Sequence, residues 1–133
     1  MTNAPVRILI ADDDQEDLEM IEEAILDAQP EAILHKVNNG REAIDYLHEV
    51  HDAELPCLII LDYNMPELNG SEAPHMIGKQ ERLKEIPRVV LSTSSAPLYM
   101  HESKKNGAIE YFVKPDTQSG LEQLAKKMLA LCA

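Results

Sequence analysis

Short apolar runs alternate along this chain with longer segments in which apolar residues recur at helical spacing. The runs are rich in Val, Ile and Leu, which favour strands buried on both faces of a parallel sheet. The segments between them supply the helices that such a sheet needs on both faces. The pattern therefore predicts an α/β fold with a single covered parallel sheet. The five predicted strands are residues 6–11, 32–37, 57–61, 88–91 and 109–113.

Capping residues predict where three of the helices begin. Asp14 precedes an apolar stripe and is expected to be the N-cap of the first helix, which ends before Pro30. Asn39, followed three residues later by Glu42, resembles a capping pair at the start of the second helix. Thr117 is expected to cap the last helix, whose apolar positions form a clear core-facing stripe.

The third and fourth helices are less regular. The third is expected to open at residues 69–71, with Pro74 in its first turn, where the missing N–H costs nothing. The fourth has a poor apolar stripe, so we expect it to be weakly anchored. Gly107 is expected to end it in the left-handed conformation.

Length and charge limit the possible functions. The chain has 133 residues, enough for one domain with a sizeable core. Its net charge of −12 argues against nucleic-acid binding, which relies on basic surface to neutralise phosphates. No apolar run approaches the roughly 20 residues that a membrane span needs. The N-terminus also lacks the basic-then-apolar order of a secretory signal.

Two cysteines are too few for a disulfide framework. We expect Cys57 to be a small core residue and Cys132 to lie at a frayed end. This cysteine usage is typical of a cytoplasmic protein.

Polar side chains follow four of the predicted strands, and the carboxyl ends of parallel strands open on the same edge of a sheet. We therefore expect these side chains to lie close together. Clustered carboxylates repel one another, so they are predicted to bind a hard divalent cation or to have raised pKa values. A lysine and a hydroxyl would add a positive charge and a hydrogen-bond donor for a phosphoryl group. The residues are Asp12 and Asp13, Asp62, Ser92 with Thr93, and Lys114.

With these residues in place, the chain resembles the receiver domains of two-component response regulators over essentially its full length. The motifs are specific because all of them occur in this order and at these spacings. The resemblance implies a flavodoxin-like three-layer sandwich with strand order 2-1-3-4-5 and five helices. It also implies a single receiver domain over residues 1–133 with no effector domain. The motifs are Ile8-Leu9-Ile10-Ala11-Asp12-Asp13, Leu61-Asp62-Tyr63-Asn64-Met65-Pro66 with Gly70, Leu91-Ser92, and Tyr111-Phe112-Val113-Lys114-Pro115.

The resemblance implies that Asp62 accepts a phosphoryl group from a phosphohistidine. The donor would be a sensor histidine kinase or a histidine phosphotransfer protein. Lys114 would pair with the phosphoryl oxygens, and its bond to Pro115 is expected to be cis. Oxygen atoms at the same edge would hold Mg²⁺ or Mn²⁺, namely those of Asp12, Asp13, Asp62 and the backbone carbonyl of Asn64.

The resemblance also implies a switch. Ser92 occupies the position of a hydroxyl residue that moves to bond the phosphoryl group, and Thr93 is the alternative for this role. Tyr111 occupies the position of an aromatic ring that swings inward. The change would alter contacts with a downstream protein target. The implied protein is a bacterial, cytoplasmic phosphoprotein, a monomer or weak homodimer. It would not be an enzyme beyond catalysing its own phosphorylation and dephosphorylation.

Other interpretations remain open. A pseudo-receiver would act only as a binding module. A small-molecule phosphatase with an Asp nucleophile usually carries a second Asp two residues later, where this chain has Asn64. A flavodoxin-like cofactor binder would need a phosphate-cradling loop after the first strand, where three aspartates would repel phosphate.

Further acidic residues follow the first predicted strand. We interpret them as a solvated helix face, which could favour a basic kinase surface. They are Glu16, Asp17, Glu19, Glu22 and Glu23.

Overall fold

The computed structural model describes residues 5–65 and 72–132. Five strands form one parallel sheet in the order β2-β1-β3-β4-β5, as predicted. Each strand lies within one residue of its expected bounds. The motif residues Pro66 and Gly70 and the expected start of the third helix at residues 69–71 lie outside the described residues. The strands are β1 (Arg7–Ala11), β2 (Ile33–Val37), β3 (Leu58–Asp62), β4 (Arg88–Ser92) and β5 (Glu110–Val113).

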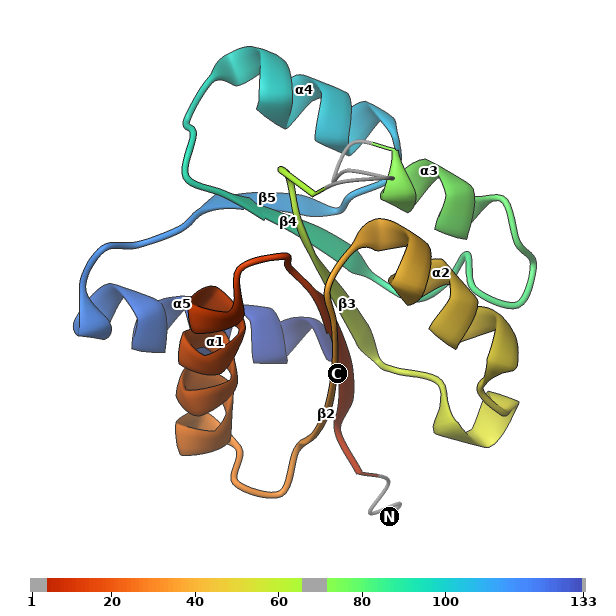
Figure 1. Ribbon diagram of the computed structural model, residues 1–133, viewed down its shortest axis with the longest axis horizontal. Helices are drawn as coiled ribbons and strands as arrows, with labels where there is room; N and C mark the ends of the chain where they lie inside the picture. Colours follow the sequence, from red (N-terminus) through yellow and green to blue (C-terminus); the bar gives the residue numbers. More distant parts are fainter. Residues whose placement is uncertain (1–4, 66–71, 133) are drawn as a thin grey trace.

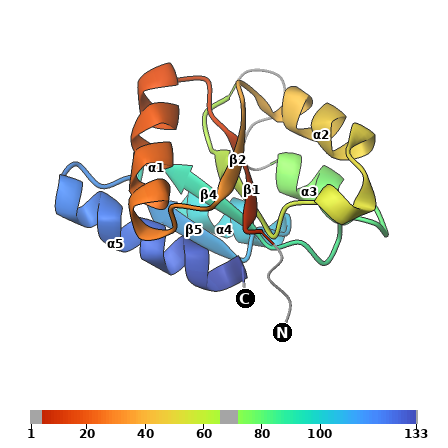
Figure 2. The ribbon, with the colours of Figure 1, turned by 90° about the horizontal axis from the view of Figure 1, so that it is seen from below.

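Helices cover both faces of the sheet (Figure 1). One face carries α1 and α5, and the other carries α2 and α3, an arrangement seen most clearly along the layers (Figure 2). No helix in the described ranges is long and apolar enough to cross a membrane. The helices are α1 (Gln15–Ala28), α2 (Gly40–Glu49), α3 (Ala73–Gly78), α4 (Pro97–Lys105) and α5 (Gln118–Leu129), with short 3-10 turns at Asp52–Glu54 and Ala130–Cys132.

Alternate residues of the central strands build the two sides of the core. In β1, Ile8 and Ile10 pack toward α1 and α5, whereas Leu9 and Ala11 pack toward α2 and α3. Every residue of β3 is buried. Successive side chains of a strand point to opposite faces, so a run that is apolar throughout is what a sheet covered on both sides requires.

The predicted helix starts are confirmed. The Asp14 side chain accepts a hydrogen bond from the backbone N–H of Glu16 at 2.9 Å. Asn39 accepts one from Glu42 at 2.8 Å, and Thr117 caps α5. Pro74 lies in the first turn of α3, where it interrupts no intrahelical bond.

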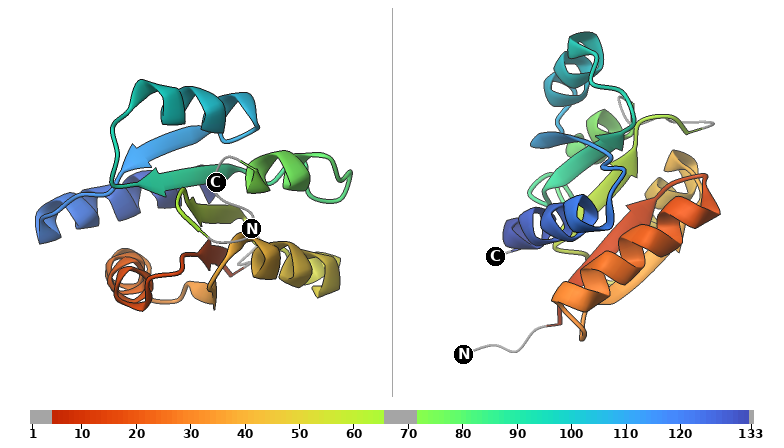
Figure 3. Two further views of the ribbon diagram at one scale, coloured as in Figure 1. Left: turned by 45° about the horizontal axis from the view of Figure 1, so that its top comes forward. Right: turned by 90° about the vertical axis from the view of Figure 1, so that its left-hand side faces the viewer.

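Helix α4 is weakly anchored, as predicted. Ser103 is its one buried residue, and Leu98 is 61% exposed. Gly107 follows the helix with a φ of +113°, in the left-handed region, as expected. In both views of Figure 3, α4 lies at the opposite end of the molecule from α1.

Two expectations are wrong. Cys57 and Cys132 form a disulfide bond, with their Cα atoms 5.0 Å apart, because α5 and the turn after it bring the C-terminal end beside the start of β3. Cys57 does pack against the core, as expected, but it is bonded, and Cys132 packs there too and is not frayed. The described peptide bonds include none in the cis form, so Lys114–Pro115 is trans, the isomer that X–Pro bonds ordinarily prefer.

Candidate functional site

Strand pairing brings the predicted site residues to one edge of the sheet. Asp62 ends β3 and is paired with Leu91 of β4. Ser92 ends β4, and its carbonyl oxygen accepts a hydrogen bond of 2.7 Å from the backbone N–H of Lys114. Asp12 follows directly after β1, and its backbone N–H donates to the carbonyl of Val37 at 3.1 Å. The backbone of the sheet thus fixes the position of each group.

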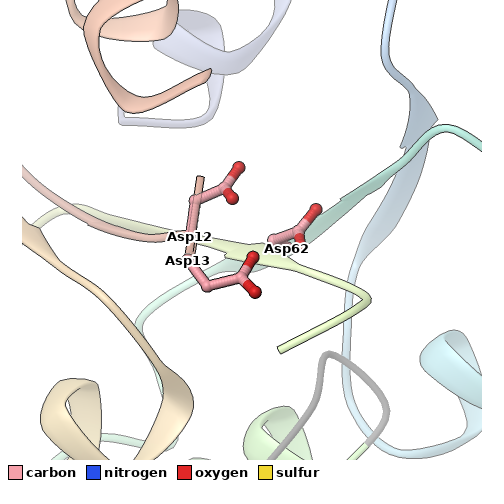
Figure 4. Close-up of side chains that lie close together, drawn as sticks. All are labelled: Asp12, Asp13 and Asp62. Carbon is pink, nitrogen blue, oxygen red and sulfur yellow. The ribbon is translucent and has the colours of Figure 1, made fainter. Parts of the chain in front are cut away.

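Three carboxylates meet at this edge (Figure 4). One oxygen from each of Asp12, Asp13 and Asp62 lies within 4.8 Å of the others. Asp12 is 1% exposed and Asp62 is 6% exposed, whereas Asp13 faces solvent. An all-oxygen donor set with one side open to water suits a hard divalent cation such as Mg²⁺ or Mn²⁺.

The electrostatics of the cluster also fit a cation. Burial, together with the negative charges of Asp12 and Asp13, raises the pKa of Asp62 to about 6 against the opposing effect of Lys114. Burial likewise raises the pKa of Asp12. Both carboxyl groups therefore lack the solvation that an ionised acid needs, and a bound cation would supply it.

Lys114 extends from the end of β5 into the cluster. Its Nζ lies 2.7 Å from Asp62 Oδ1 and 3.0 Å from Asp12 Oδ2, and its side chain is 14% exposed. Burial alone would lower the pKa of Lys114, but hydrogen bonds to Asp17 and Asp62 raise it above its ordinary value. The lysine therefore carries a fixed positive charge beside the Asp62 carboxylate.

Asp17 is the site residue that the sequence interpretation missed. It was expected on the solvated face of α1, yet its Oδ2 lies 2.7 Å from Lys114 Nζ. Its position held a signal, because Asp17 precedes the buried Ile21 and Ala24 by four and seven residues. That spacing places it on the inward stripe of the helix. Of the five acids interpreted as a solvated face, only Asp17 lies both four residues before Ile21 and seven residues before Ala24.

The two candidate switch residues meet at Ser94. Ser92 is 1% exposed, and its Oγ accepts a hydrogen bond from the backbone N–H of Ser94 at 3.0 Å. The hydroxyl of Tyr111 donates to the backbone carbonyl of Ser94 at 2.7 Å. Thr93, the alternative hydroxyl, is exposed. Ser92 and Tyr111 are therefore linked through one loop residue.

The residue after Asp62 contacts α4. Tyr63 stacks on Tyr99, and its hydroxyl donates a hydrogen bond of 3.2 Å to Glu102. Burial and the neighbouring Glu102 raise the pKa of Tyr63, so its hydroxyl is neutral and acts as a donor. Asn64, whose backbone carbonyl is the remaining expected metal ligand, follows in the turn and is exposed.

The arrangement suits phosphoryl chemistry. A carboxylate nucleophile, an oxygen-lined cation site and a buried lysine together neutralise the charge on a transferring phosphoryl group. The buried hydroxyl of Ser92 lies at the same edge. Carboxylates are established as phosphoryl acceptors through aspartyl-phosphate intermediates.

Comparisons with known proteins agree with this geometry. Residues 8–126 match the response regulator receiver domain. The probable methanogenesis regulatory protein FilR2 of Methanothrix harundinacea is 32% identical over 94 residues, which are 69% of this chain and 61% of that protein. The chain thus matches less than two thirds of the length of this relative.

Two solved structures share the fold and part of the sequence. The phosphorylated cyanobacterial phytochrome response regulator RcpA has a TM-score of 0.83 and 31% identity, over 93% of this chain and 91% of that one. The Mn²⁺-bound response regulator Rcp1 has a TM-score of 0.81 and 26% identity, over 95% of this chain and 93% of that one. The chain belongs to the response regulator receiver domain family.

Proposed function

We propose that the chain is a phosphorylation-dependent switch in which Asp62 accepts a phosphoryl group from a phosphohistidine on a histidine kinase or phosphotransfer protein. The observation that carries this proposal is the position of the Asp62 carboxylate between the Asp12–Asp13 oxygens and the ammonium of Lys114. An Asp62 oxygen forms the new O–P bond while the P–N bond breaks. The bonding pair returns to the imidazole nitrogen of the donor, which takes up a proton.

The acidic cluster supports the metal requirement. Asp12, Asp13 and Asp62, with the backbone carbonyl of Asn64, would hold Mg²⁺ or Mn²⁺. When bound, the cation neutralises part of the charge on the phosphoryl oxygens and on the three carboxylates. Lys114 holds a second positive charge at the Asp62 oxygen that faces it. Two of the similar structures, one phosphorylated and one Mn²⁺-bound, support both parts of this proposal.

The switch follows from where the new negative charge arises. The Ser92 hydroxyl would turn from the Ser94 backbone toward the phosphoryl oxygens and donate to them. That turn would release one of the contacts that hold the loop before α4. Tyr111, bonded to the same loop residue, would move with it. A downstream protein would then meet an altered surface at α4 and β5.

In this role the chain catalyses only its own phosphorylation and dephosphorylation. Its charge of −12 suits basic protein partners. We propose bacterial, cytoplasmic signalling as its setting on the basis of the family, because the Cys57–Cys132 disulfide removes the support that the cysteine usage had given. A monomer or weak homodimer is the proposed working form.

Phosphorylation of the purified chain by acetyl phosphate and Mg²⁺, followed by intact mass, tests the proposal. We expect one acid-stable, base-labile phosphoryl group on the wild type and none on Asp62→Asn. Asp27→Asn removes an exposed carboxylate from α1 and is expected to be labelled like the wild type. Equal labelling of wild type and Asp62→Asn, or no labelling of the wild type, would overturn the proposal.

A further inference from the structure

Lys114 makes three ion pairs, and the third joins it to a residue outside the strand ends. We propose that Asp17 is a positioning residue for Lys114 that competes with the phosphoryl group for the lysine ammonium, and thereby weakens phosphoryl binding. The inference rests on the proposed function, because it concerns how that site holds its phosphoryl group.

The ammonium group has three N–H donors, and three carboxylates lie within reach of it. The distances from Nζ are 2.7 Å to Asp17, 2.7 Å to Asp62 and 3.0 Å to Asp12. Lys114 therefore has no spare donor. A phosphoryl oxygen on Asp62 can bond to Lys114 while the lysine keeps its contact with Asp62 only if Asp12 or Asp17 gives way.

Asp17 is the partner that can leave most easily. The Asp12 side chain is 2% exposed and is also held by the backbone N–H of Asp14 at 2.9 Å. Releasing Asp12 would leave a buried charge unpaired. The Asp17 side chain is 31% exposed, so water can replace the lysine around its carboxylate. Exchange of Asp17 for a phosphoryl oxygen is thus the cheaper rearrangement.

The position of Asp17 is set by the fold. It lies in the first turn of α1, whose N-terminus is fixed by the Asp14 cap. Helix α1 packs closely against α5, and the loop that leads into α5 begins directly after Lys114. The packing of α1 against α5 thus helps to hold the Asp17 carboxylate beside the Lys114 ammonium, although the two residues are 97 positions apart in the chain.

Glu16 provides a matched control. It is an acid in the same turn of α1, one residue before Asp17, and it is exposed, with its side chain outside the ion pairs of Lys114. Glu16→Gln removes the same charge from nearly the same place without touching the lysine. Any effect of Asp17→Asn beyond that of Glu16→Gln therefore comes from the contact and not from the general field.

The test is the affinity of beryllofluoride, a phosphoryl mimic, in the presence of saturating Mg²⁺. We expect Asp17→Asn to bind it about three- to fivefold more tightly than the wild type, as expected for removing one partly exposed ionic competitor. Asp17→Glu, which keeps a carboxylate within reach of Lys114, should restore wild-type affinity. Glu16→Gln should bind within about twofold of wild type at moderate salt, where the field of an exposed charge is screened.

Thermal unfolding of each variant separates positioning from folding. Asp17→Asn should bind beryllofluoride more tightly than Glu16→Gln, whereas the melting temperatures of the two variants should be similar. Equal affinities of wild type and Asp17→Asn would overturn the inference and leave the proposed function intact. Failure of the wild type itself to bind beryllofluoride would instead count against the proposed function. An equal gain in Glu16→Gln would also overturn the inference.

Discussion

Tyr63, the residue directly after Asp62, stacks on Tyr99 of α4 with the ring centroids 4.6 Å apart. The same tyrosine donates a hydrogen bond to Glu102, one turn further along that helix. These contacts tie the end of β3 to a helix that buries little else. The helix most loosely attached to the sheet is therefore held in part by the neighbour of the proposed phosphoryl acceptor.

Tyr99→Ala is expected to lower the free energy of unfolding by about 1–2 kcal/mol, because it removes an aromatic stack and the apolar area buried with it. Leu98→Ala, in the same helix but 61% exposed, should change it by less than about 0.5 kcal/mol. Urea unfolding of both variants gives the comparison. Equal effects would mean that the stack does not anchor α4.

Asp62→Asn is expected to stabilise the protein at neutral pH when divalent cations are chelated. Burial raises the pKa of Asp62 from 3.8 to about 6. Between these values the folded state binds more protons than the unfolded state, so the free energy of unfolding falls as pH rises and the loss is complete above about pH 6. The variant lacks this loss. Its free energy of unfolding should exceed that of the wild type by up to about 3 kcal/mol at pH 7 and by little at pH 4.

Urea unfolding between pH 4 and 8 in a chelator measures this difference. Asp45→Asn, which changes an exposed carboxylate of α2, should follow the wild type across the range. If the difference in the free energy of unfolding between Asp62→Asn and wild type stayed constant with pH, burial would not be shifting the pKa of Asp62.

Reduction of the Cys57–Cys132 disulfide is expected to destabilise the fold by about 2–4 kcal/mol, since the bond restricts the unfolded chain over a sequence separation of 75. Thermal unfolding with and without dithiothreitol measures the loss. Cys132→Ser should unfold like the reduced wild type and should not respond to the reductant. Alkylation of two thiols in the native, unreduced protein would contradict the bond.

Gly107→Ala is expected to lower the free energy of unfolding by about 1–2 kcal/mol, because an L-residue is strained at a φ of +113°. The added Cβ would also lie 3.4 Å from the Pro74 carbonyl oxygen. Gly78→Ala is the control, since its Cβ meets the same Arg88 guanidinium at 3.3 Å without a positive φ. If Gly78→Ala lowered the free energy of unfolding by as much, the effect would come from crowding against Arg88 and not from backbone strain.

The sequence predicted those features that depend on neighbouring residues or on strand order. The caps at Asp14, Asn39 and Thr117 are local, and each side chain bonds within three residues of itself. The gathering of Asp12, Asp62 and Lys114 required only that parallel strands end at one edge. The strand order itself came from the family resemblance.

The features that escaped prediction depend on how helices pack. The spacing of Asp17 from the buried residues of α1 indicates that it faces inward, but its contact with Lys114 also requires the distance of α1 from β5, which no local pattern encodes. The disulfide likewise depends on where the turn after α5 meets β3. The stacking of Tyr63 on Tyr99 joins a strand end to a helix with almost no apolar stripe.

The disulfide divides the chain into two parts of different covalent character. Residues 57–132 form a closed ring that contains β3, β4, β5 and the helices between and after them. The preceding segment, with β1, α1, β2 and α2, is an open arm attached to that ring through a single peptide linkage. Asp12 and Asp13 belong to the arm, whereas Asp62 and Lys114 belong to the ring. A cation or a phosphoryl group held by both sets would therefore clamp the arm onto the ring.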